Sequence, residues 1–352
     1  MSELRYDALQ KRWVIIATER QHRPHDFRPE PVQIHNHDEC PFCPGHEHMT
    51  PPEIASIRPD GSKSNRPGWT VRVTQNKFPA LHLFEVNWEL GAEGFYETIP
   101  GYGVHEVIIE GPDHDKSFVD LSLEMIFDIL RMYRYRLDVH MQDRLIKYAL
   151  VFKNHGSRAG ASLVHPHSQI IGTPVTPRNI RMELMSTLRH FAETNRCLVC
   201  DMVKRERNDN LRVIYDDGAI VAFCNYAARF PFEFIIISAK HEPFYHRESD
   251  RTLRALAKCL REMLTRLKIA LNDPPFNFIL HSGPNINAEP IFPGFWKTIE
   301  QDYHWHIEVI PRLVRTAGFE WGSGLHINPM PPETAAQFLR EVVLTKRAVQ
   351  TS

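Results

Sequence analysis

The apolar residues of this chain occur in two kinds of segment: short runs of β-branched and aromatic residues, and longer stretches with helical spacing. In the stretch 121–139, for example, Leu123, Phe127 and Leu130 recur on one face, which predicts an amphipathic helix. The stretch 22–67, rich in proline and histidine, is expected to be an irregular arm. The patterns predict helices over 121–139, 180–195, 249–271 and 332–346, and strands over 13–17, 70–74, 105–110, 147–153, 211–215, 220–224, 233–238, 276–281 and 305–310.

One series of features occurs twice in the same order, which indicates an internal repeat. Each series has a Cys-x-x-Cys pair, a strand leading to a histidine, a helix, a strand and a His-x-His motif. A glutamate also stands eight positions before the lone histidine in both, Glu106 in the first and Glu233 in the second. We therefore expect two units, 1–178 and 179–352. The matching residues are Cys40, Cys43, His114, His165, His167 and Gln169, and then Cys197, Cys200, His241, His304, His306 and Glu308.

Composition changes this picture little, but it narrows the partners. The chain is 42% apolar and 24% charged, which is ordinary for a globular protein, and its net charge is -1. No overall field would attract nucleic acid or a membrane surface, so a phosphate-bearing substrate needs a local site. No apolar run approaches the roughly 20 residues of a membrane span, and the polar N-terminus is unlike a signal peptide. We expect a cytoplasmic protein that binds neither nucleic acid nor a membrane.

In a reducing compartment, closely paired cysteines indicate metal ligands before disulfides. Structural Zn²⁺ takes four ligands, often two cysteines and two distant histidines. A single Cys-x-x-Cys could equally be two buried thiols, but the repetition with matching histidines favours two zinc ions per chain. His306 remains an alternative to His304, and iron an alternative to zinc in the second site. The expected sets are Cys40, Cys43, His114 and His165, and Cys197, Cys200, His241 and His304.

The segment 154–169 combines groups that suit phosphate chemistry. Gly160 permits close backbone approach, and Asn154 and Ser162 can donate to phosphate oxygens. His165 and His167 lie on one face of an extended segment, so one can bind metal while the other attacks phosphorus. A pair of ordinary core or surface histidines is the alternative. We expect His167 to be the nucleophile and Gln169 to hold a non-bridging phosphate oxygen.

The second series lacks these properties. Glu308 replaces Gln169, and a carboxylate there would repel a phosphodiester. Ser282 stands in the place expected for the counterpart of Asn154. The first unit should therefore be catalytic and the second structural. Arg20 and Arg23 could clamp a pyrophosphate, although two exposed charges on a loop would look the same.

With these residues in view, the chain resembles the galactose-1-phosphate uridylyltransferase family of the histidine-triad superfamily. The resemblance spans nearly the full length and rests on His-Pro-His-Ser-Gln at 165–169, Cys-Pro-Phe-Cys at 40–43, Gly-Pro-Asp-His at 111–114 and the loop with Asn154, Gly160 and Ser162. The tail from Gly318 to Pro329 begins with the family's Gly-aromatic-Glu motif, at Gly318 to Glu320. The family's lysine a few residues before this motif and its glutamine after it, which lie around the hexose, have no clear match here. In this respect it is closer to archaeal and thermophilic members and to a plant ADP-glucose phosphorylase relative.

The resemblance implies a doubled α+β fold around antiparallel sheet with helices packed on it, usually dimeric. It also implies a ping-pong reaction in galactose metabolism, in which UDP-glucose forms a uridylyl-histidine on His167 and galactose 1-phosphate then takes the nucleotide. One alternative is a nucleotide-sugar phosphorylase with phosphate as acceptor; another is a non-enzymatic zinc and nucleotide module. Positions that match family residues around nucleotide and phosphate are Arg20, Arg23, Asn76, Asn154, Gly160, Ser162, Gln169 and Glu320.

Overall fold

The computed structural model describes residues 2–17, 19, 37–85, 91–93, 95–289 and 296–344. Arg20 and Arg23 lie outside this range. The strands are β1 (Glu3–Asp7), β2 (Arg12–Ile16), β3 (Glu53–Ile57), β4 (Val71–Gln75), β5 (Gly91–Glu93), β6 (Tyr96–Thr98), β7 (Val104–Ile109), β8 (Tyr148–His155), β9 (His167–Thr173), β10 (Val213–Asp216), β11 (Ile220–Cys224), β12 (Phe234–Ser238), β13 (Phe276–His281), β14 (His306–Pro311) and β15 (His326–Asn328). The helices are α1 (Leu123–Met141), α2 (Arg178–Thr194), α3 (Leu198–Asp209), α4 (Asp250–Leu271), α5 (Ile299–Asp302), α6 (Gly318–Ser323) and α7 (Pro332–Glu341).

Local sequence explains where the long helices begin and end. The side chain of Ser249 accepts a hydrogen bond from the Thr252 amide and caps α4. The same helix ends at Asn272, which adopts the left-handed conformation common at helix C-termini. Ser122 caps α1 in the same way, accepting a hydrogen bond from the Met125 amide. The apolar faces of α1 and α4 are buried against the sheet.

A ten-stranded antiparallel sheet forms the centre of the molecule, in the order β10-β11-β12-β14-β13-β8-β9-β7-β4-β3. Read outward from the middle, the strands β8-β9-β7-β4-β3 correspond in order to β13-β14-β12-β11-β10. The two sets join through antiparallel pairing of β8 with β13, where Phe152 lies opposite Ile279. The expectation of an α+β fold with antiparallel sheet and packed helices is therefore confirmed.

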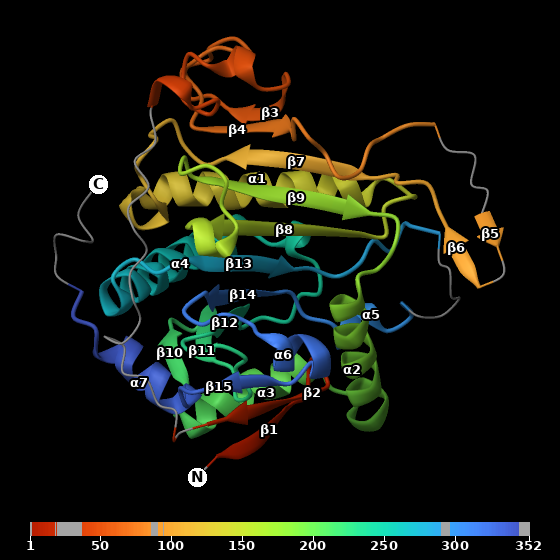
Figure 1. Ribbon diagram of the computed structural model, residues 1–352, viewed down its shortest axis with the longest axis vertical. Helices are drawn as coiled ribbons and strands as arrows, with labels where there is room; N and C mark the ends of the chain where they lie inside the picture. Colours follow the sequence, from red (N-terminus) through yellow and green to blue (C-terminus); the bar gives the residue numbers. More distant parts are fainter. Residues whose placement is uncertain are drawn as a thin grey trace.

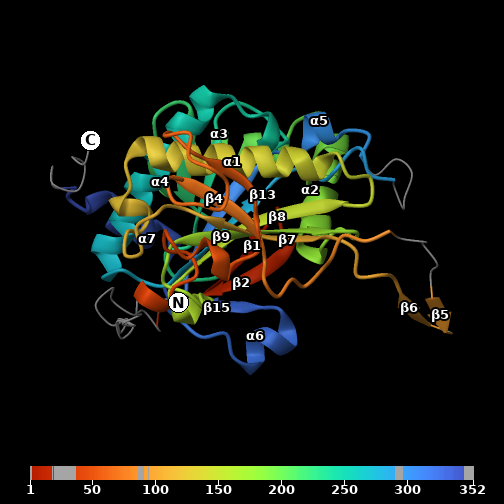
Figure 2. The ribbon, with the colours of Figure 1, turned by 90° about the horizontal axis from the view of Figure 1, so that it is seen from above.

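The two faces of this sheet differ, and Figures 1 and 2 show α1 and α4 lying along one of them. The main core lies between those helices and strand residues such as Ile108, Ile170 and Val309. On the opposite face, α3 covers β11 and β12, and the small β1-β2-β15 sheet lies on the same half of the molecule. Among the described residues, the segment around Phe42 and Trp69 packs on the first half of that face, against Val107 and Ile109.

Several elements were not predicted. The supposed irregular arm contains the edge strand β3, and the polar sequence after Cys197 forms α3. The C-terminal helix is shorter than expected and ends at Glu341. The β5–β6 hairpin projects away from the body (Figures 1 and 2). In the part of the chain that the structure describes, none of the helices has the length and apolar character needed to cross a membrane.

Candidate active site

His167 opens strand β9, and only 7% of its surface is exposed. Its Nδ1 lies 2.9 Å from the carbonyl oxygen of His165, so Nδ1 carries the ring proton and donates it there. Burial lowers the pKa of His167, which favours the neutral ring with its lone pair on Nε2. The Phe42 ring packs edge-on at a centroid distance of 5.3 Å. The imidazole is thus held in the form that can attack an electrophile.

A buried ion pair anchors the backbone of His167 from the helix-covered face. Lys153 Nζ donates to the His167 carbonyl oxygen at 3.1 Å and pairs with Glu110. Glu110 also accepts hydrogen bonds from the Tyr133 hydroxyl, at 2.7 Å, and from Ser168. All four of these side chains are buried. Because an uncompensated buried charge is costly, the network holds the start of β9 in one position.

Two side-chain amides flank His167 on the opposite face. The carbonyl oxygen of Gln169 lies 2.8 Å from His105 Nε2, and that of Asn154 accepts a hydrogen bond of 2.9 Å from Asn277. Gly160 has a φ of +93°, and a Cβ built there would lie 3.5 Å from the Asn154 amide nitrogen. Glycine therefore provides both the backbone conformation and a close approach to that amide.

Of the other residues predicted to bind nucleotide or phosphate, Asn76 and Ser162 lie on the first half of the sheet and Glu320 does not. Asn76 follows β4, and its amide nitrogen is 3.0 Å from His105 Nε2. Ser162 is exposed on the loop between β8 and β9. Glu320 lies in α6, where its carboxylate accepts the Ala317 amide at the start of that helix. Figure 1 shows α6 beside β15 in the other half of the molecule, so within one chain Glu320 is not brought to His167.

A cleft of about 460 Å³ opens beside His167 at the ends of β8 and β9. Its lining includes Asn154 from β8, Gly156 and Val164 from the connecting loop, and Lys268 near the end of α4. A cleft of this size fits a small phosphate-bearing ligand.

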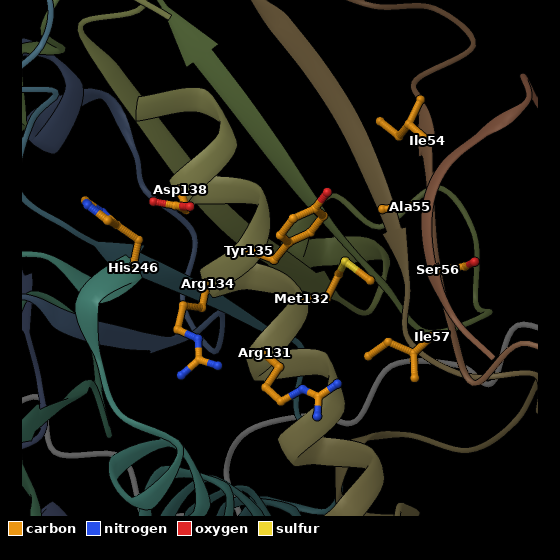
Figure 3. A pocket seen from close by; sticks show the side chains of 10 residues that line it. All are labelled: Ile54, Ala55, Ser56, Ile57, Arg131, Met132, Arg134, Tyr135, Asp138 and His246. Atoms are coloured by element: carbon orange, nitrogen blue, oxygen red, sulfur yellow. The ribbon is translucent and has the colours of Figure 1, made fainter. Parts of the chain in front are cut away.

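A larger cavity, of about 620 Å³, lies between β3 and α1 (Figure 3). Met132 and Tyr135 face Ala55 and Ile57 across it, with Arg131 at its rim. None of its described lining residues is a predicted nucleophile or metal ligand, so the chemistry belongs to the smaller cleft.

The first predicted metal set comes together beside the cleft. The Sγ atom of Cys43 lies 3.3 Å from His114 Nδ1 and 3.6 Å from His165 Nδ1, and Cys40 Sγ lies 3.7 Å from His165 Nδ1. Sulfur and nitrogen ligands of a tetrahedral zinc ion are about 3.5 Å apart. His165 Nε2 is 2.8 Å from the Gly111 carbonyl oxygen, an outer hydrogen bond that orients a ligating histidine. The donors therefore fit a zinc ion.

The second set has the same form. Cys200 Sγ lies 3.4 Å from His241 Nδ1 and 3.5 Å from His304 Nδ1. Cys197 belongs to the same group, in which all ligand atoms lie within 4.8 Å of one another. His304 Nε2 contacts the Ser238 hydroxyl at 2.9 Å. His304, and not the alternative His306, is the fourth member of this group.

Strand register corrects one correspondence between the halves. Phe152 lies opposite Gln169 in the first half, and Ile279 lies opposite Glu308 in the second. Extending the first pairing by two residues places Asn154 opposite His167, just as His281 lies opposite His306. The counterpart of Asn154 is therefore His281, and the expectation of Ser282 was wrong by one residue.

The two glutamates eight residues before His114 and His241 are not counterparts either. Glu106 faces α1 and pairs with Arg136 at 2.6 Å. Glu233 precedes β12 and binds Arg229 on the opposite face of the sheet. The connection from strand to histidine differs by one residue between the halves, and side chains alternate between the faces of a strand. Equal spacing was in this case misleading.

The second half fills the place where the first half has its cleft. His306 is fully buried, and Glu308 pairs with Arg229 at 2.7 Å. His281 Nδ1 lies 2.9 Å from Glu183, and Glu183, His281 and His306 bring their ligand atoms within 4.8 Å of one another. This buried polar cluster was not predicted, because Glu183 comes from α2, far from both histidines in sequence. All three side chains are buried, so His306 does not face an open cleft as His167 does.

Arg229 should be essential to the stability of this half. Its guanidinium also binds Glu233 at 2.6 Å, so Arg229→Met would remove the arginine partner of two buried carboxylates and leave Glu308 with the weaker contact to His281, at 3.8 Å. We expect the free energy of unfolding to fall by about 3–5 kcal/mol at neutral pH, measured by urea denaturation.

The loss should shrink in acid. Burial acts to raise the pKa of Glu308, but Arg229 and His281 outweigh it and hold that pKa well below its usual range. The stabilisation from Glu308 is thus present above the unfolded pKa, near 4.3, and is lost as pH falls through the lower folded value. An equal deficit at pH 7 and at pH 4 would contradict this account.

Comparison with known proteins places the chain in context. Residues 1–177 match the family described as "Galactose-1-phosphate uridyl transferase, N-terminal domain", and residues 129–351 match a domain of unknown function (DUF4921). An Arabidopsis thaliana "ADP-glucose phosphorylase" is 36% identical over 97% of this chain and 93% of its own. A Thermotoga maritima "Galactose-1-phosphate uridylyltransferase" is 28% identical over 97% and 98%.

Comparison with solved structures finds the same two kinds of enzyme. The Arabidopsis thaliana ADP-glucose phosphorylase with bound ADP-glucose superposes with a TM-score of 0.80 at 32% identity, covering 98% of this chain and all of the other. A structure described as that of a uridylyltransferase gives 0.72 at 26% identity, with 99% of both chains covered.

Proposed function

The chain belongs to the galactose-1-phosphate uridylyltransferase family, and we propose that it transfers a nucleotidyl group from a nucleotide sugar through a covalent intermediate on His167. The observation that carries the proposal is the geometry of His167. Its Nδ1 is committed to the His165 carbonyl oxygen, which leaves Nε2 as the nucleophile beside two amides and a cleft.

The proposed chemistry balances without an added acid or base. Nε2 of His167 attacks the α-phosphorus as the bond from that phosphorus to the bridging oxygen breaks, and the oxygen leaves with the sugar 1-phosphate. The ring is then a nucleotidylated imidazolium whose Nδ1 proton stays hydrogen-bonded to His165. An acceptor oxygen next attacks the phosphorus, the N–P bond breaks, and the neutral histidine returns.

We propose ADP-glucose as donor and inorganic phosphate as acceptor, with ADP and glucose 1-phosphate as products. The full-length similarity to the ADP-glucose phosphorylase supports this choice, as does the C-terminal tail. The second candidate is UDP-glucose with galactose 1-phosphate as acceptor, in galactose metabolism, which the similarity to uridylyltransferases favours. Both share the first half-reaction.

A screen of donors and acceptors separates the two. ADP-glucose and UDP-glucose are each incubated with the enzyme and with phosphate or galactose 1-phosphate, and products are resolved by ion-exchange chromatography. We expect the highest kcat/KM with ADP-glucose and phosphate. Turnover confined to UDP-glucose and galactose 1-phosphate would refute the phosphorylase assignment while retaining the histidine chemistry.

Further roles complete the proposal. Gln169 and Asn154, with Asn76, Gly160 and Ser162, would hold the phosphates, and two bound Zn²⁺ ions would order the fold around the site. We extend the proposal to Arg20, Arg23 and Glu320 as substrate ligands, to a cytoplasmic homodimer, and to division into a catalytic unit 1–178 and a degenerate unit 179–352.

A further inference from the structure

The amides beside His167 can serve a phosphate only if their NH₂ ends, and not their carbonyl ends, face it. An amide turned the other way would present an oxygen to a phosphate oxygen and repel it. The orientation is therefore part of the catalytic apparatus, and two residues outside the predicted site determine it.

The orientation of Gln169 follows from a backbone amide. The Ala80 N–H donates to His105 Nδ1 at 3.1 Å, so the neutral imidazole of His105 carries its proton on Nε2. That proton needs an acceptor, and the side-chain atom of Gln169 at 2.8 Å must be its carbonyl oxygen. The NH₂ group of Gln169 is left as a donor.

The orientation of Asn154 follows from a backbone carbonyl. Asn277 places its side-chain nitrogen 2.8 Å from the Ala159 carbonyl oxygen, which can only accept. The same nitrogen lies 2.9 Å from Asn154, so the atom of Asn154 that meets it is the carbonyl oxygen. The Asn154 NH₂ group then lies beside Gly160.

A third amide follows the same rule by itself. The carbonyl oxygen of Asn76 accepts the Phe78 N–H at 2.9 Å, so its NH₂ end is the one beside His105, 3.0 Å from Nε2. Because the Nε2 proton is directed at Gln169, the Asn76 NH₂ keeps both of its hydrogens for other acceptors. The second half of the molecule has no such arrangement among its described residues: Glu308 and His281 occupy the places of Gln169 and Asn154 and form ion pairs instead.

We infer that His105 and Asn277 are positioning residues, which fix the amides of Gln169 and Asn154 as hydrogen-bond donors to the transferred phosphoryl group. The inference rests on the proposed function. It also assigns a catalytic contribution to the second half of the sequence, because Asn277 lies in β13. Neither residue needs to touch the substrate, and each acts through the amide beside it.

A double-mutant cycle tests His105. The rate of adduct formation is measured in single turnovers with saturating ADP-glucose for wild type, His105→Phe, Gln169→Ala and the double variant. Loss of a donor to a developing charge typically costs about 10²-fold, and we expect about tenfold for His105→Phe. In the Gln169→Ala background the further loss should be less than about twofold, since the residue through which His105 acts is gone.

Two further variants separate positioning from packing. His105→Gln keeps an N–H donor at similar reach and should recover most of the rate. His246→Phe is the matched control, because His246 is a partly buried histidine in the cavity between β3 and α1, and it should leave the rate unchanged. Melting temperature and zinc content should be the same in all of these variants.

At position 277 a hydrogen-bond donor can be replaced by an acceptor of the same shape. In Asn277→Asp a carboxylate faces Asn154, which must turn its NH₂ inward and its oxygen toward the phosphate. We expect a loss of more than about tenfold, greater than that of Asn277→Leu. In the Asn154→Ala background most of this loss should disappear, whereas simple repulsion by the added charge would persist.

The outcomes are distinguishable. Additive losses in both cycles would overturn the inference even if wild type forms the adduct normally. Failure of zinc-loaded wild type to form any adduct would instead refute the proposed function on which the inference rests.

Discussion

His167→Ala should abolish the nucleotidyl adduct and lower turnover by on the order of 10⁴-fold or more. No other described residue presents a free imidazole Nε2 to the cleft with its ring held between a backbone carbonyl and an aromatic edge. The measurement mixes enzyme with a nucleotide sugar labelled in the nucleotide. The protein is then tested for a label that is lost in acid and stable in base, as expected for a phosphoramidate.

His167→Gly provides the complementary result. The space left beside Phe42 could admit free imidazole, which would then be nucleotidylated and released, so we expect partial recovery of turnover with added imidazole. His306→Gln is the matched control, since it alters the corresponding position of the second half, where the histidine is fully buried. It should retain the adduct in the folded fraction, and full activity of His167→Ala would refute the mechanism.

Much of this site could be predicted from the sequence because it depends on short-range spacing. Residues two apart on a strand share a face, and this rule alone predicts that His165, His167 and Gln169 point to the same side. The metal sets were found through the repetition of paired cysteines with matching histidines, and both sets form compact groups. The long helices were predicted for the same reason, since their apolar spacing is regular.

What was missed depends on strand register, which one-dimensional spacing does not contain. His105 meets Gln169 across 64 residues, and Asn277 meets Asn154 across 123. Nothing in the local pattern indicates either contact. The pairing of Glu106 with Glu233 failed for the same reason, because a one-residue difference after the strand moves a side chain to the other face. The strand β3 has little apolar alternation and lies at the sheet edge.

The buried ion pair between Lys153 and Glu110 could also have been predicted from the sequence. A lysine within an otherwise apolar strand must find a partner, and a glutamate at the end of another apolar strand must do so as well. Lys153 and Glu110 are those two residues, and they meet beneath His167. Their positions in the second half hold Leu280 and Ser238, so the charged anchor exists only where the chemistry is proposed.

The two metal sites should differ in what their loss affects. We expect about two zinc ions per chain in the wild type and about one in either Cys40→Ser or Cys197→Ser, measured by metal analysis of the purified proteins. Structural zinc contributes several kcal/mol to folding, so each variant should melt on the order of 10 °C lower. The two variants should nonetheless differ in the rate at which each folded molecule forms the nucleotidyl adduct.

The reason lies in the connection between ligand and nucleophile. His165 is a ligand of the first site, and its carbonyl oxygen accepts the Nδ1 proton of His167. Losing that metal should loosen the hydrogen bond that fixes the nucleophile, so Cys40→Ser should form the adduct at least about tenfold more slowly. The ligands of the second site hold α3 against β11 and β12, away from the cleft, and Cys197→Ser should keep its rate. Equal rate losses would contradict this difference, and wild-type stoichiometry near zero would overturn both ligand sets.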